Sequence, residues 1–236
     1  MTMDPKSRIL VALDTTDLDR AAGWAGALKG RVGGVKIGKE FFTAHGPAGV
    51  RRVTDGGIPL FLDLKFHDIP NTVGGAIRAA LPLRPFMINV HASGGEGMMR
   101  AAAEAAREAG PRRPLVLGVT VLTSLDDGDL KAVGVSAPAA EQVVRLGLLA
   151  KKSGLDGVVC SALEINALRR ACGPDFTLVV PGIRPAGADA GDQKRVMTPA
   201  QAVAQGADYL VIGRPITGAA DPAGAADDIA ASLGSR

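Results

Sequence analysis

The sequence predicts a (β/α)₈ barrel, or TIM barrel, formed as a single domain by residues 1–236. Short apolar runs alternate along the chain with longer amphipathic segments rich in alanine, which is the pattern of parallel strands joined by helices. The length of 236 residues is close to the roughly 250 residues typical of this fold. Hydrophobic residues make up 47% of the chain and aromatic residues only 3%, so an aliphatic core is expected, as suits strands buried on both faces.

The predicted strands are short runs rich in β-forming residues and bounded by glycine, proline or polar residues. They are residues 8–14 (RILVALD), 33–38 (GGVKIG), 59–65 (PLFLDLK), 86–91 (FMINVH), 115–120 (LVLGVT), 156–161 (DGVVCS), 177–182 (TLVVPG) and 208–213 (DYLVIG). Helix-like stretches lie between them, for example residues 17–28, 94–109, 137–153 and 199–205. Because the strand–helix unit repeats along the whole chain, we expect a closed barrel rather than an open, doubly wound sheet.

The predicted strands repeatedly end in polar or charged residues. Active sites of this fold lie at the carboxyl ends of the strands, and an aliphatic strand that ends in charge is better explained by a site than by packing. The polar strand ends are Asp14, Lys36, Asp63, Lys65, Asn89, His91, Thr120, Arg184 and Arg214.

The segment 61–72 (FLDLKFHDIPNT) carries the densest group of candidate residues. Strand side chains alternate between two faces, so Asp63 and Lys65 should point into the barrel while Leu62 and Leu64 pack against helices. Two further charges should point inward at the same end, Lys36 from the preceding strand and Asp14 from the first. Opposite charges side by side favour each other's ionised form, so an alternating array is expected. Two plainer interpretations stay open: a structural ion pair between Asp63 and Lys65, and Asp68 as a cap of the following helix.

Two later segments suit an anion. Residues 180–185 (VPGIRP) and 211–216 (VIGRPI) follow the last two predicted strands, where this fold commonly binds phosphate. Gly182 and Gly213 let backbone N–H groups approach an anion, and Arg184 and Arg214 supply planar cationic donors. Residues 186–193 are small, glycine-rich and polar, as expected of a lid that would bring Gln193 to the ligand. The alternative is two ordinary turns with solvated arginines.

Composition limits where the protein is expected to act and what it is expected to bind. No apolar run approaches the about 20 residues needed to span a bilayer, and the polar start of the chain does not suggest a signal peptide. Cys160 and Cys172 lack the spacing of a metal or redox site, so buried, inert thiols are expected. We therefore expect a cytoplasmic protein that does not bind membranes. The net charge of +3 suits a small anionic substrate, whereas one Trp and one Tyr leave few stacking surfaces for nucleic acid.

Taken together, these motifs resemble the bacterial orotidine 5′-phosphate decarboxylase family over nearly the whole chain. The shared motifs are VALD (11–14), VKIG (35–38), FLDLKFHDIPNT (61–72), NVHASGG (89–95), VTVLTS (119–124), PGIRP (181–185), GDQKRVMTP (191–199) and DYLVIGRPI (208–216). The resemblance implies conversion of orotidine 5′-monophosphate to UMP and CO₂ in de novo pyrimidine biosynthesis, with no metal and no cofactor.

The resemblance also implies roles for individual residues. Lys65 would donate a proton to C6 of the pyrimidine, and Asp63 would lie beside the departing carboxylate. Lys36 and Asp14 would contact the ribose and hold the charge array. Asp68, with Ile69 and Thr72, would enter the site of a neighbouring subunit, which implies a homodimer with shared active sites. The further implied substrate-binding residues are Leu64, Phe66, His67, Ile69, Pro70, Asn71, Thr72, Thr123 (or Ser124 beside it), Arg184, Gln193, Gly213 and Arg214.

Two competing interpretations remain. Related barrels such as 3-hexulose-6-phosphate synthase and 3-keto-gulonate-6-phosphate decarboxylase resemble the chain at Asp14, Asp63, Lys65 and Asp68, but they use Mg²⁺ and carry an acid where this chain has Lys36. A lysine there disfavours a divalent cation. The other alternative is a barrel that binds a phosphorylated ligand without catalysis, which gives little reason to bury such an array.

Overall fold

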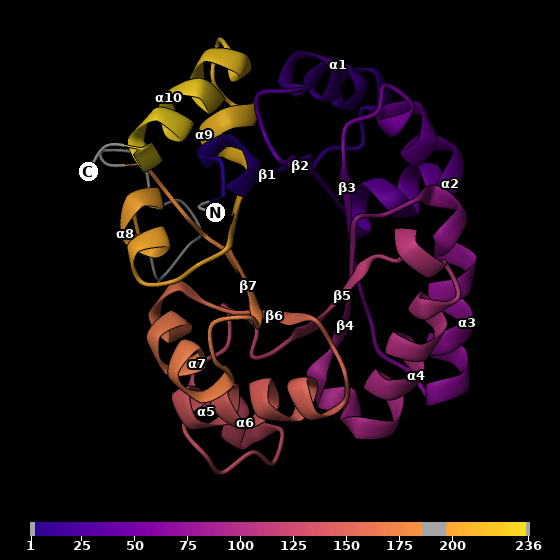
Figure 1. Ribbon diagram of the computed structural model, residues 1–236, viewed down its shortest axis with the longest axis vertical. Helices are drawn as coiled ribbons and strands as arrows, with labels where there is room; N and C mark the ends of the chain where they lie inside the picture. The colour runs from indigo at the N-terminus through magenta and orange to yellow at the C-terminus, as the bar shows by residue number, and fades with distance from the viewer. Residues whose placement is uncertain (1–2, 186–196, 235–236) are drawn as a thin grey trace.

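In the computed structural model, which describes residues 3–185 and 197–234, the strands close into a barrel in the order β1 to β8. Every neighbouring pair is parallel, including β1 with β8. Figure 1 shows the strands as an inner ring with the helices arranged around it. The predicted (β/α)₈ barrel is confirmed.

The observed elements agree closely with the predicted ones. The strands are β1 (Ile9–Ala12), β2 (Gly34–Gly38), β3 (Leu60–Phe66), β4 (Met87–His91), β5 (Leu115–Val119), β6 (Gly157–Val159), β7 (Thr177–Pro181) and β8 (Tyr209–Ile212). The α-helices are α1 (Leu18–Leu28), α2 (Lys39–Thr54), α3 (Pro70–Ala80), α4 (Gly95–Arg107), α5 (Asp127–Ala132), α6 (Ala139–Lys152), α7 (Ile165–Cys172), α8 (Pro199–Ala204), α9 (Arg214–Thr217) and α10 (Pro222–Gly234). Short 3₁₀ helices are η1 (Pro5–Arg8), η2 (Leu81–Leu83), η3 (Ala92–Gly94), η4 (Gly110–Arg112) and η5 (Ala162–Glu164).

Because successive side chains of a strand point to opposite faces, the apolar residues form two separate layers. One layer fills the barrel interior and consists of Leu10, Ala12, Phe61, Met87, Leu117, Val179 and Val211. The intervening residues, such as Val35, Ile37 and Leu62, belong to the larger layer between the barrel and its helices. Aliphatic side chains dominate both layers, as predicted. None of the helices among the described residues is long and apolar enough to cross a membrane.

Local sequence signals explain where several helices begin and bend. The Asp17 carboxylate accepts a hydrogen bond from the Arg20 N–H at 3.0 Å and so caps α1. Within α2, Gly46 adopts φ 55°, a left-handed conformation that suits glycine, and the helix kinks there, just before Pro47.

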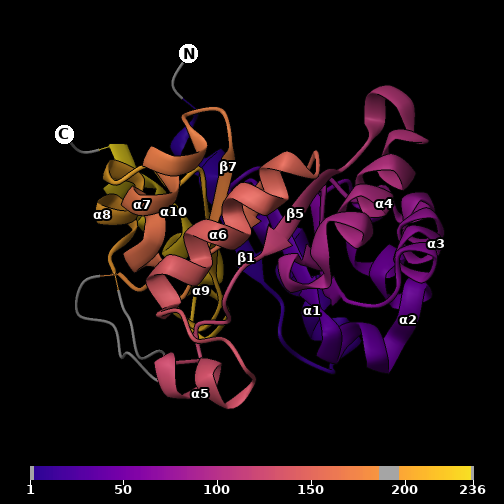
Figure 2. The same cartoon turned by 90° about the horizontal axis from the view of Figure 1, so that it is seen from below.

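One strand departs from regular alternation. The pairing of β3 with β4 changes register between Leu62 and Phe66, and Lys65 adopts φ 51°, which is unusual for a residue with a side chain. The sequence pattern did not predict this irregularity. It lies at the carboxyl end of β3, which is the end of the barrel that also carries α5, opposite both chain termini (Figure 2).

Candidate active site

Four charged side chains form a continuous chain of contacts at the carboxyl end of the barrel. The Lys36 Nζ lies 3.0 Å from Asp14 Oδ1 and 3.3 Å from Asp63 Oδ2. The Lys65 Nζ lies 2.6 Å from Asp63 Oδ1. Lys36 comes from β2, Asp63 and Lys65 come from β3, and Asp14 lies just beyond β1. We call these four residues the charged cluster; its order of alternating charge is the one that the sequence predicted.

Burial at the centre of the charged cluster is offset by opposite charge. Lys36 is 8% exposed and Asp63 is 7% exposed. Burial alone would lower the pKa of Lys36, but the Asp63 and Asp14 carboxylates outweigh it and hold that pKa above its usual value. Burial would likewise raise the pKa of Asp63, but Lys36, Lys65 and hydrogen bonds to the carboxylate hold it below its usual value. Both groups are therefore charged at neutral pH.

Asn89, on β4, makes hydrogen bonds to a side chain and to the backbone at the carboxyl end of β3. Its side chain is fully buried, and its amide Nδ2 donates to Asp63 Oδ1 at 2.7 Å. Its carbonyl Oδ1 accepts from the Lys65 backbone N–H at 2.8 Å. Asn89 thus fixes the carboxylate and supports the left-handed backbone of Lys65 at once. The sequence marked Asn89 as a polar strand end but assigned it no role, although an amide within an otherwise apolar strand was the available signal.

An apolar cavity of about 180 Å³ adjoins the charged cluster. Lys36, Asp63 and Lys65 border it, and Thr123 lines it, whereas the neighbouring Ser124 is exposed and does not. Its other walls are Phe61, Val119, Val121, Leu122, Val159, Cys160, Pro181 and Val211. The cavity is large enough for one small ring and places that ring directly against the Lys65 and Asp63 side chains.

A second, more polar cavity of about 360 Å³ shares Lys36 with the first. Arg184 and Arg214 both line it, so the structure brings together the two arginines of the predicted phosphate site. Gly182 and Gly213 line it as well, and Arg184 is only 6% exposed. Residues that the sequence did not single out, such as Thr217, complete the wall. The predicted lid and Gln193 lie outside the described residues.

Known proteins share both the sequence and the architecture described above. The family model of the orotidine 5′-phosphate decarboxylase / HUMPS family matches residues 7–229. The chain belongs to this family. The resemblance drawn from the sequence motifs is confirmed.

Several similar proteins that match nearly the whole chain are named orotidine 5′-phosphate decarboxylase. The orotidine 5′-phosphate decarboxylase of Paramagnetospirillum magneticum is 56% identical over 230 residues, which cover 96% of this chain and 98% of that protein. That of Moorella thermoacetica is 54% identical over 236 residues, covering 98% and 94%. The crystal structure of orotidine 5′-phosphate decarboxylase from Lactobacillus acidophilus has a TM-score of 0.85 and 38% identity, covering 96% of this chain and 99% of that one.

The other residues of the family motif, from Leu64 to Thr72, lie around the charged cluster, and residues 67–72 form the rim of the site. Leu64 and Phe66 pack into the outer hydrophobic layer, so their side chains point away from the charged cluster. The Asp68 carboxylate accepts from the Ile69 N–H at 2.6 Å. It does not cap α3, because Ile69 holds the N-cap position and no side chain caps that helix. The exposed residues of this rim are His67, Asp68, Ile69, Pro70, Asn71 and Thr72.

His91 is a second residue that the sequence left without a role. It follows Asn89 on the inward face of β4, and its ring centroid lies 5.5 Å from that of His67. Burial, together with the nearby His67, Lys39 and Lys65, lowers the pKa of His91 from 6.5 to about 4. The imidazole is therefore neutral at physiological pH and adds no charge beside the cluster. Among the described residues, no group of three or more His, Cys, Asp or Glu side chains is placed to hold a metal ion.

Proposed function

We propose that this carboxy-lyase converts orotidine 5′-monophosphate to UMP and CO₂, without metal or cofactor, in de novo pyrimidine biosynthesis. One observation carries the proposal: the charged cluster lies where an apolar cavity meets a basic one. The apolar cavity suits a pyrimidine, and the cavity lined by Arg184 and Arg214 suits the 5′-phosphate. Lys36, common to both, would meet the ribose between them.

The chemistry assigned to the charged cluster follows from its charges. Cleavage of the bond between C6 and the carboxylate leaves an electron pair on C6 as CO₂ departs. A fixed ammonium at Lys65 would stabilise that developing charge and then transfer its proton to C6, after which Lys65 regains a proton from water. The Asp63 carboxylate would lie beside the substrate carboxylate, and their repulsion would raise the energy of the bound substrate.

Geometry at Lys65 supports this assignment. An ammonium acts on a carbanion only if it is held in place before the bond breaks. Lys65 is held at its side chain by Asp63 at 2.6 Å and at its backbone by Asn89 at 2.8 Å. The phosphate site lies away from the reacting carbon, so its binding energy can order the site and raise turnover as well as affinity.

A homodimer with shared active sites is part of the proposal. Asp68 and Ile69 are exposed at the carboxyl end of β3, and Ile69, a large apolar residue, is 66% exposed. A second copy would cover this apolar side chain, while Asp68, with Thr72, would reach the partner's charged cluster. A dimer in which each site needs both chains predicts complementation between two defective variants.

Complementation tests the shared site directly. In a mixed dimer of Lys65→Ala and Asp68→Ala chains, one of the two sites keeps both residues. After subunit exchange, about a quarter of wild-type activity is expected from two inactive parents. Lack of any recovery despite proven exchange would place Asp68 in its own chain's site or outside catalysis.

The related magnesium-dependent barrels are the competing assignment, and the position of Lys36 disfavours them. Its ammonium contacts both Asp14 and Asp63, so a divalent cation at those carboxylates would be placed against a fixed positive charge. A purely ligand-binding barrel is disfavoured because such a site would gain little from bearing the cost of burying this array. With this pathway role, the enzyme would act in the cytoplasm. Its partner would be the nucleotide substrate, and it would bind neither nucleic acid nor membranes.

The substrate assignment is tested by turnover with alternative substrates. The purified protein should convert orotidine 5′-monophosphate to UMP in excess EDTA, followed by loss of the orotate absorbance and chromatography of UMP. Keto-sugar phosphates with Mg²⁺ should not be turned over. Conversion of a sugar phosphate, together with an inert nucleotide, would instead assign the chain to the magnesium-dependent branch.

A further inference from the structure

A second cleft, of about 880 Å³, lies at the amino end of the barrel, where β4 and β5 begin. It is formed by the ends of α3 and α4 and by the two segments that lead into these strands. The carboxyl ends of β3 and β4, which carry the charged cluster and Asn89, lie at the opposite end of the barrel. Its lining contains four arginines and a single acid, Glu108.

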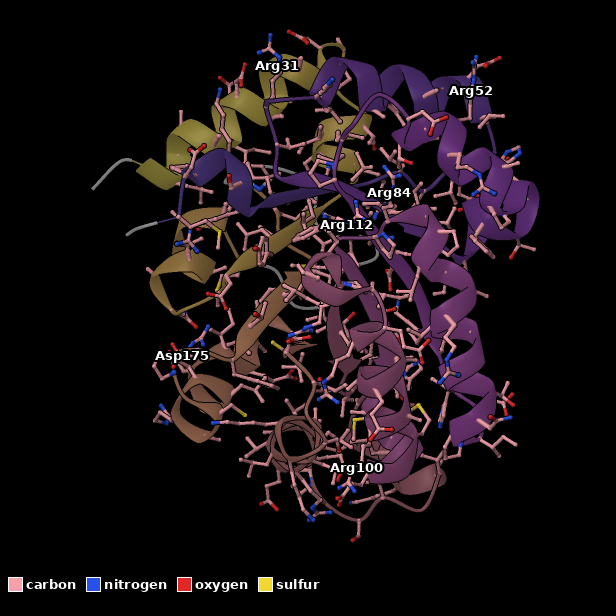
Figure 3. All side chains as sticks on the ribbon, turned by 45° about the vertical axis from the view of Figure 1, so that its right-hand side comes forward. Arg31, Arg52, Arg84, Arg100, Arg112 and Asp175 are labelled. Carbon is pink, nitrogen blue, oxygen red and sulfur yellow. The ribbon has the colours of Figure 1, made fainter. Side chains whose placement is uncertain are left out.

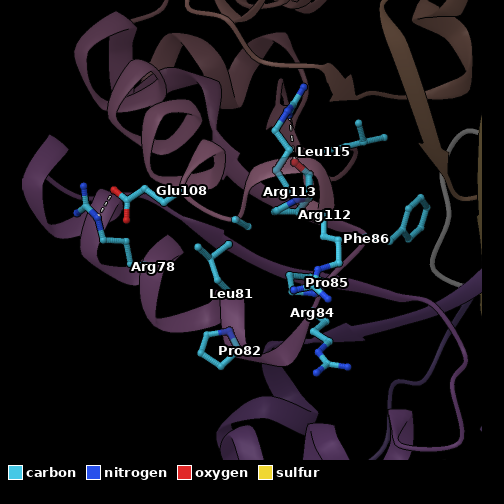
Figure 4. A pocket seen from close by; sticks show the side chains of 12 residues that line it. Arg78, Leu81, Pro82, Arg84, Pro85, Phe86, Glu108, Arg112, Arg113 and Leu115 are labelled. Carbon is cyan, nitrogen blue, oxygen red and sulfur yellow. Dashed lines mark hydrogen bonds and ion pairs between the residues drawn. The ribbon is translucent and has the colours of Figure 1, made fainter.

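The four arginines fall into two pairs with different surroundings (Figure 4). Arg78 is bound to Glu108, with 2.7 Å between Nε and Oε1. Arg113 makes two hydrogen bonds to the Asp156 carboxylate, at 2.9 and 2.8 Å. Arg84 and Arg112 are exposed, and no acid or carbonyl within the described residues binds either guanidinium. The cleft therefore carries two positive charges that the described chain does not compensate.

These two arginines lie side by side. In Figure 4 they flank Pro85 at one end of the cleft, whereas Arg78 turns toward Glu108 at the other. Figure 3 shows the same neighbourhood from another direction, with the labelled Arg52 and Arg100 far away at the edge of the molecule. Two like charges at one end of a cleft create a positive potential there that attracts an anion.

The backbone holds both arginines in short, proline-bounded segments. Arg84 lies between Pro82 and Pro85 and adopts φ 51°, and Arg112 follows Pro111 within η4. Proline fixes φ and leaves few conformations to lose on binding. A guanidinium offers a planar fork of donors that matches phosphate oxygens. Two such forks on rigid segments suit a ligand with more than one phosphate group.

We propose that the cleft formed by Arg84 and Arg112 binds a small oligophosphate anion, such as the phosphate chain of a nucleoside triphosphate. A neighbouring cleft of about 590 Å³ shares Arg84 with it and is lined by a further arginine, Arg51, and by one acid, Asp55. Phe86 lines both clefts and provides an apolar wall beside the arginines. This site is separate from the cavity of Arg184 and Arg214 and does not depend on the reaction proposed there.

Calorimetric titration with inorganic tripolyphosphate at low salt tests the site. One anion is expected to bind at this cleft, in addition to any that enters the cavity of Arg184 and Arg214, and the affinity should fall with rising salt. The Arg84→Gln/Arg112→Gln variant removes both charges and leaves shorter, polar side chains, and it should bind the anion at this cleft at least about tenfold more weakly. The Arg84→Lys/Arg112→Lys variant keeps the charges and should bind more tightly than the glutamine variant.

Two controls separate this site from others. The Arg52→Gln/Arg100→Gln variant loses the same charge elsewhere on the surface, and Arg214→Ala weakens only the carboxyl-end cavity. Both should retain the binding event that the glutamine variant weakens, with an affinity at that cleft within about twofold of wild type. The proposal is overturned if no binding is seen at about 5 mM anion. It is also overturned if the first control or Arg214→Ala weakens binding as much as the glutamine variant, or if the lysine and glutamine variants bind alike.

Discussion

The two ends of the barrel handle positive charge in opposite ways. At the carboxyl end, Lys36 is buried and contacts two carboxylates, and Lys65 contacts one of them. At the amino end, Arg84 and Arg112 have no acidic partner among the described residues, and both stay exposed. The difference shows what burial requires: a charge can leave water only beside its counter-charge. A compensated cluster can be held rigidly for chemistry, whereas uncompensated arginines remain available to an external anion.

Removing the shared carboxylate should have the largest effect. Asp63→Ala leaves the buried Lys36 ammonium with Asp14 alone and frees the Lys65 side chain. We expect a loss of about 3 kcal/mol in the free energy of unfolding, measured by urea denaturation, because a buried charge loses its partner. Turnover should fall by more than about 10³-fold. Asp175→Ala, at an exposed position, is the control; equal stability of the two variants would mean that Asp63 does not compensate Lys36.

Removing a residue of the proposed phosphate site should lower turnover less than Asp63→Ala does, and it should change both kcat and KM. Arg214→Ala removes one charge-assisted contact to the proposed 5′-phosphate, so kcat/KM for orotidine 5′-monophosphate should fall about 10- to 100-fold. Because phosphate binding would also order the site, kcat should fall together with a rise in KM. Unchanged kinetics in steady-state assays would remove this arginine from the site, whereas Arg31→Ala should leave both constants unchanged.

Asn89 should behave as a positioning residue, with a smaller effect on kcat alone. Asn89→Ala removes the partner of the Asp63 carboxylate and of the Lys65 backbone N–H, so kcat should fall about tenfold while KM stays within about twofold. Asn166→Ala, which removes an exposed hydrogen bond to Gln205, is the matched control. A change confined to KM, or none, would contradict the positioning role.

The smallest expected effect concerns pH. The pKa of His91 is about 4 in the folded chain, below its usual 6.5, mainly because of burial. The unfolded chain therefore binds more protons than the folded chain between these values, and the free energy of unfolding should fall as pH decreases from 6.5 toward 4. His91→Gln should flatten this part of the stability profile. Parallel profiles for His91→Gln and wild type would show that His91 is not a cause.

The sequence was a good guide to the carboxyl end for a topological reason. Parallel strands bring their carboxyl ends to one side, and period-two alternation says which residues point inward. Those two rules suffice to place Lys36 beside Asp63, whereas Arg184 and Arg214 were brought together by the position at which this fold commonly binds phosphate, after its last two strands. The two rules say nothing of residues beyond the strand pattern. The backbone of Lys65 depends on Asn89 from the next strand, and local sequence does not reveal that hydrogen bond.

The cleft at the amino end of the barrel could not be predicted from these rules. Prolines around Arg84 and Arg112 mark turns, but no periodicity shows that the two turns converge or that Glu108 and Asp156 are bound to Arg78 and Arg113. The proposed role of Asp68 requires a second chain, so it stays a prediction, as do the contacts of Gln193 and the single-domain organisation of residues 1–236.

The most direct test of the contrast between the two ends compares turnover of orotidine 5′-monophosphate, in excess EDTA, by three proteins: wild type, Lys65→Ala and Arg84→Gln/Arg112→Gln. The account predicts that the wild-type chain forms UMP rapidly, that Lys65→Ala loses more than about 10³-fold, and that the arginine variant stays within about twofold. Near-normal turnover by Lys65→Ala, or a comparable loss in the arginine variant, would contradict the assignment of the chemistry to the charged cluster.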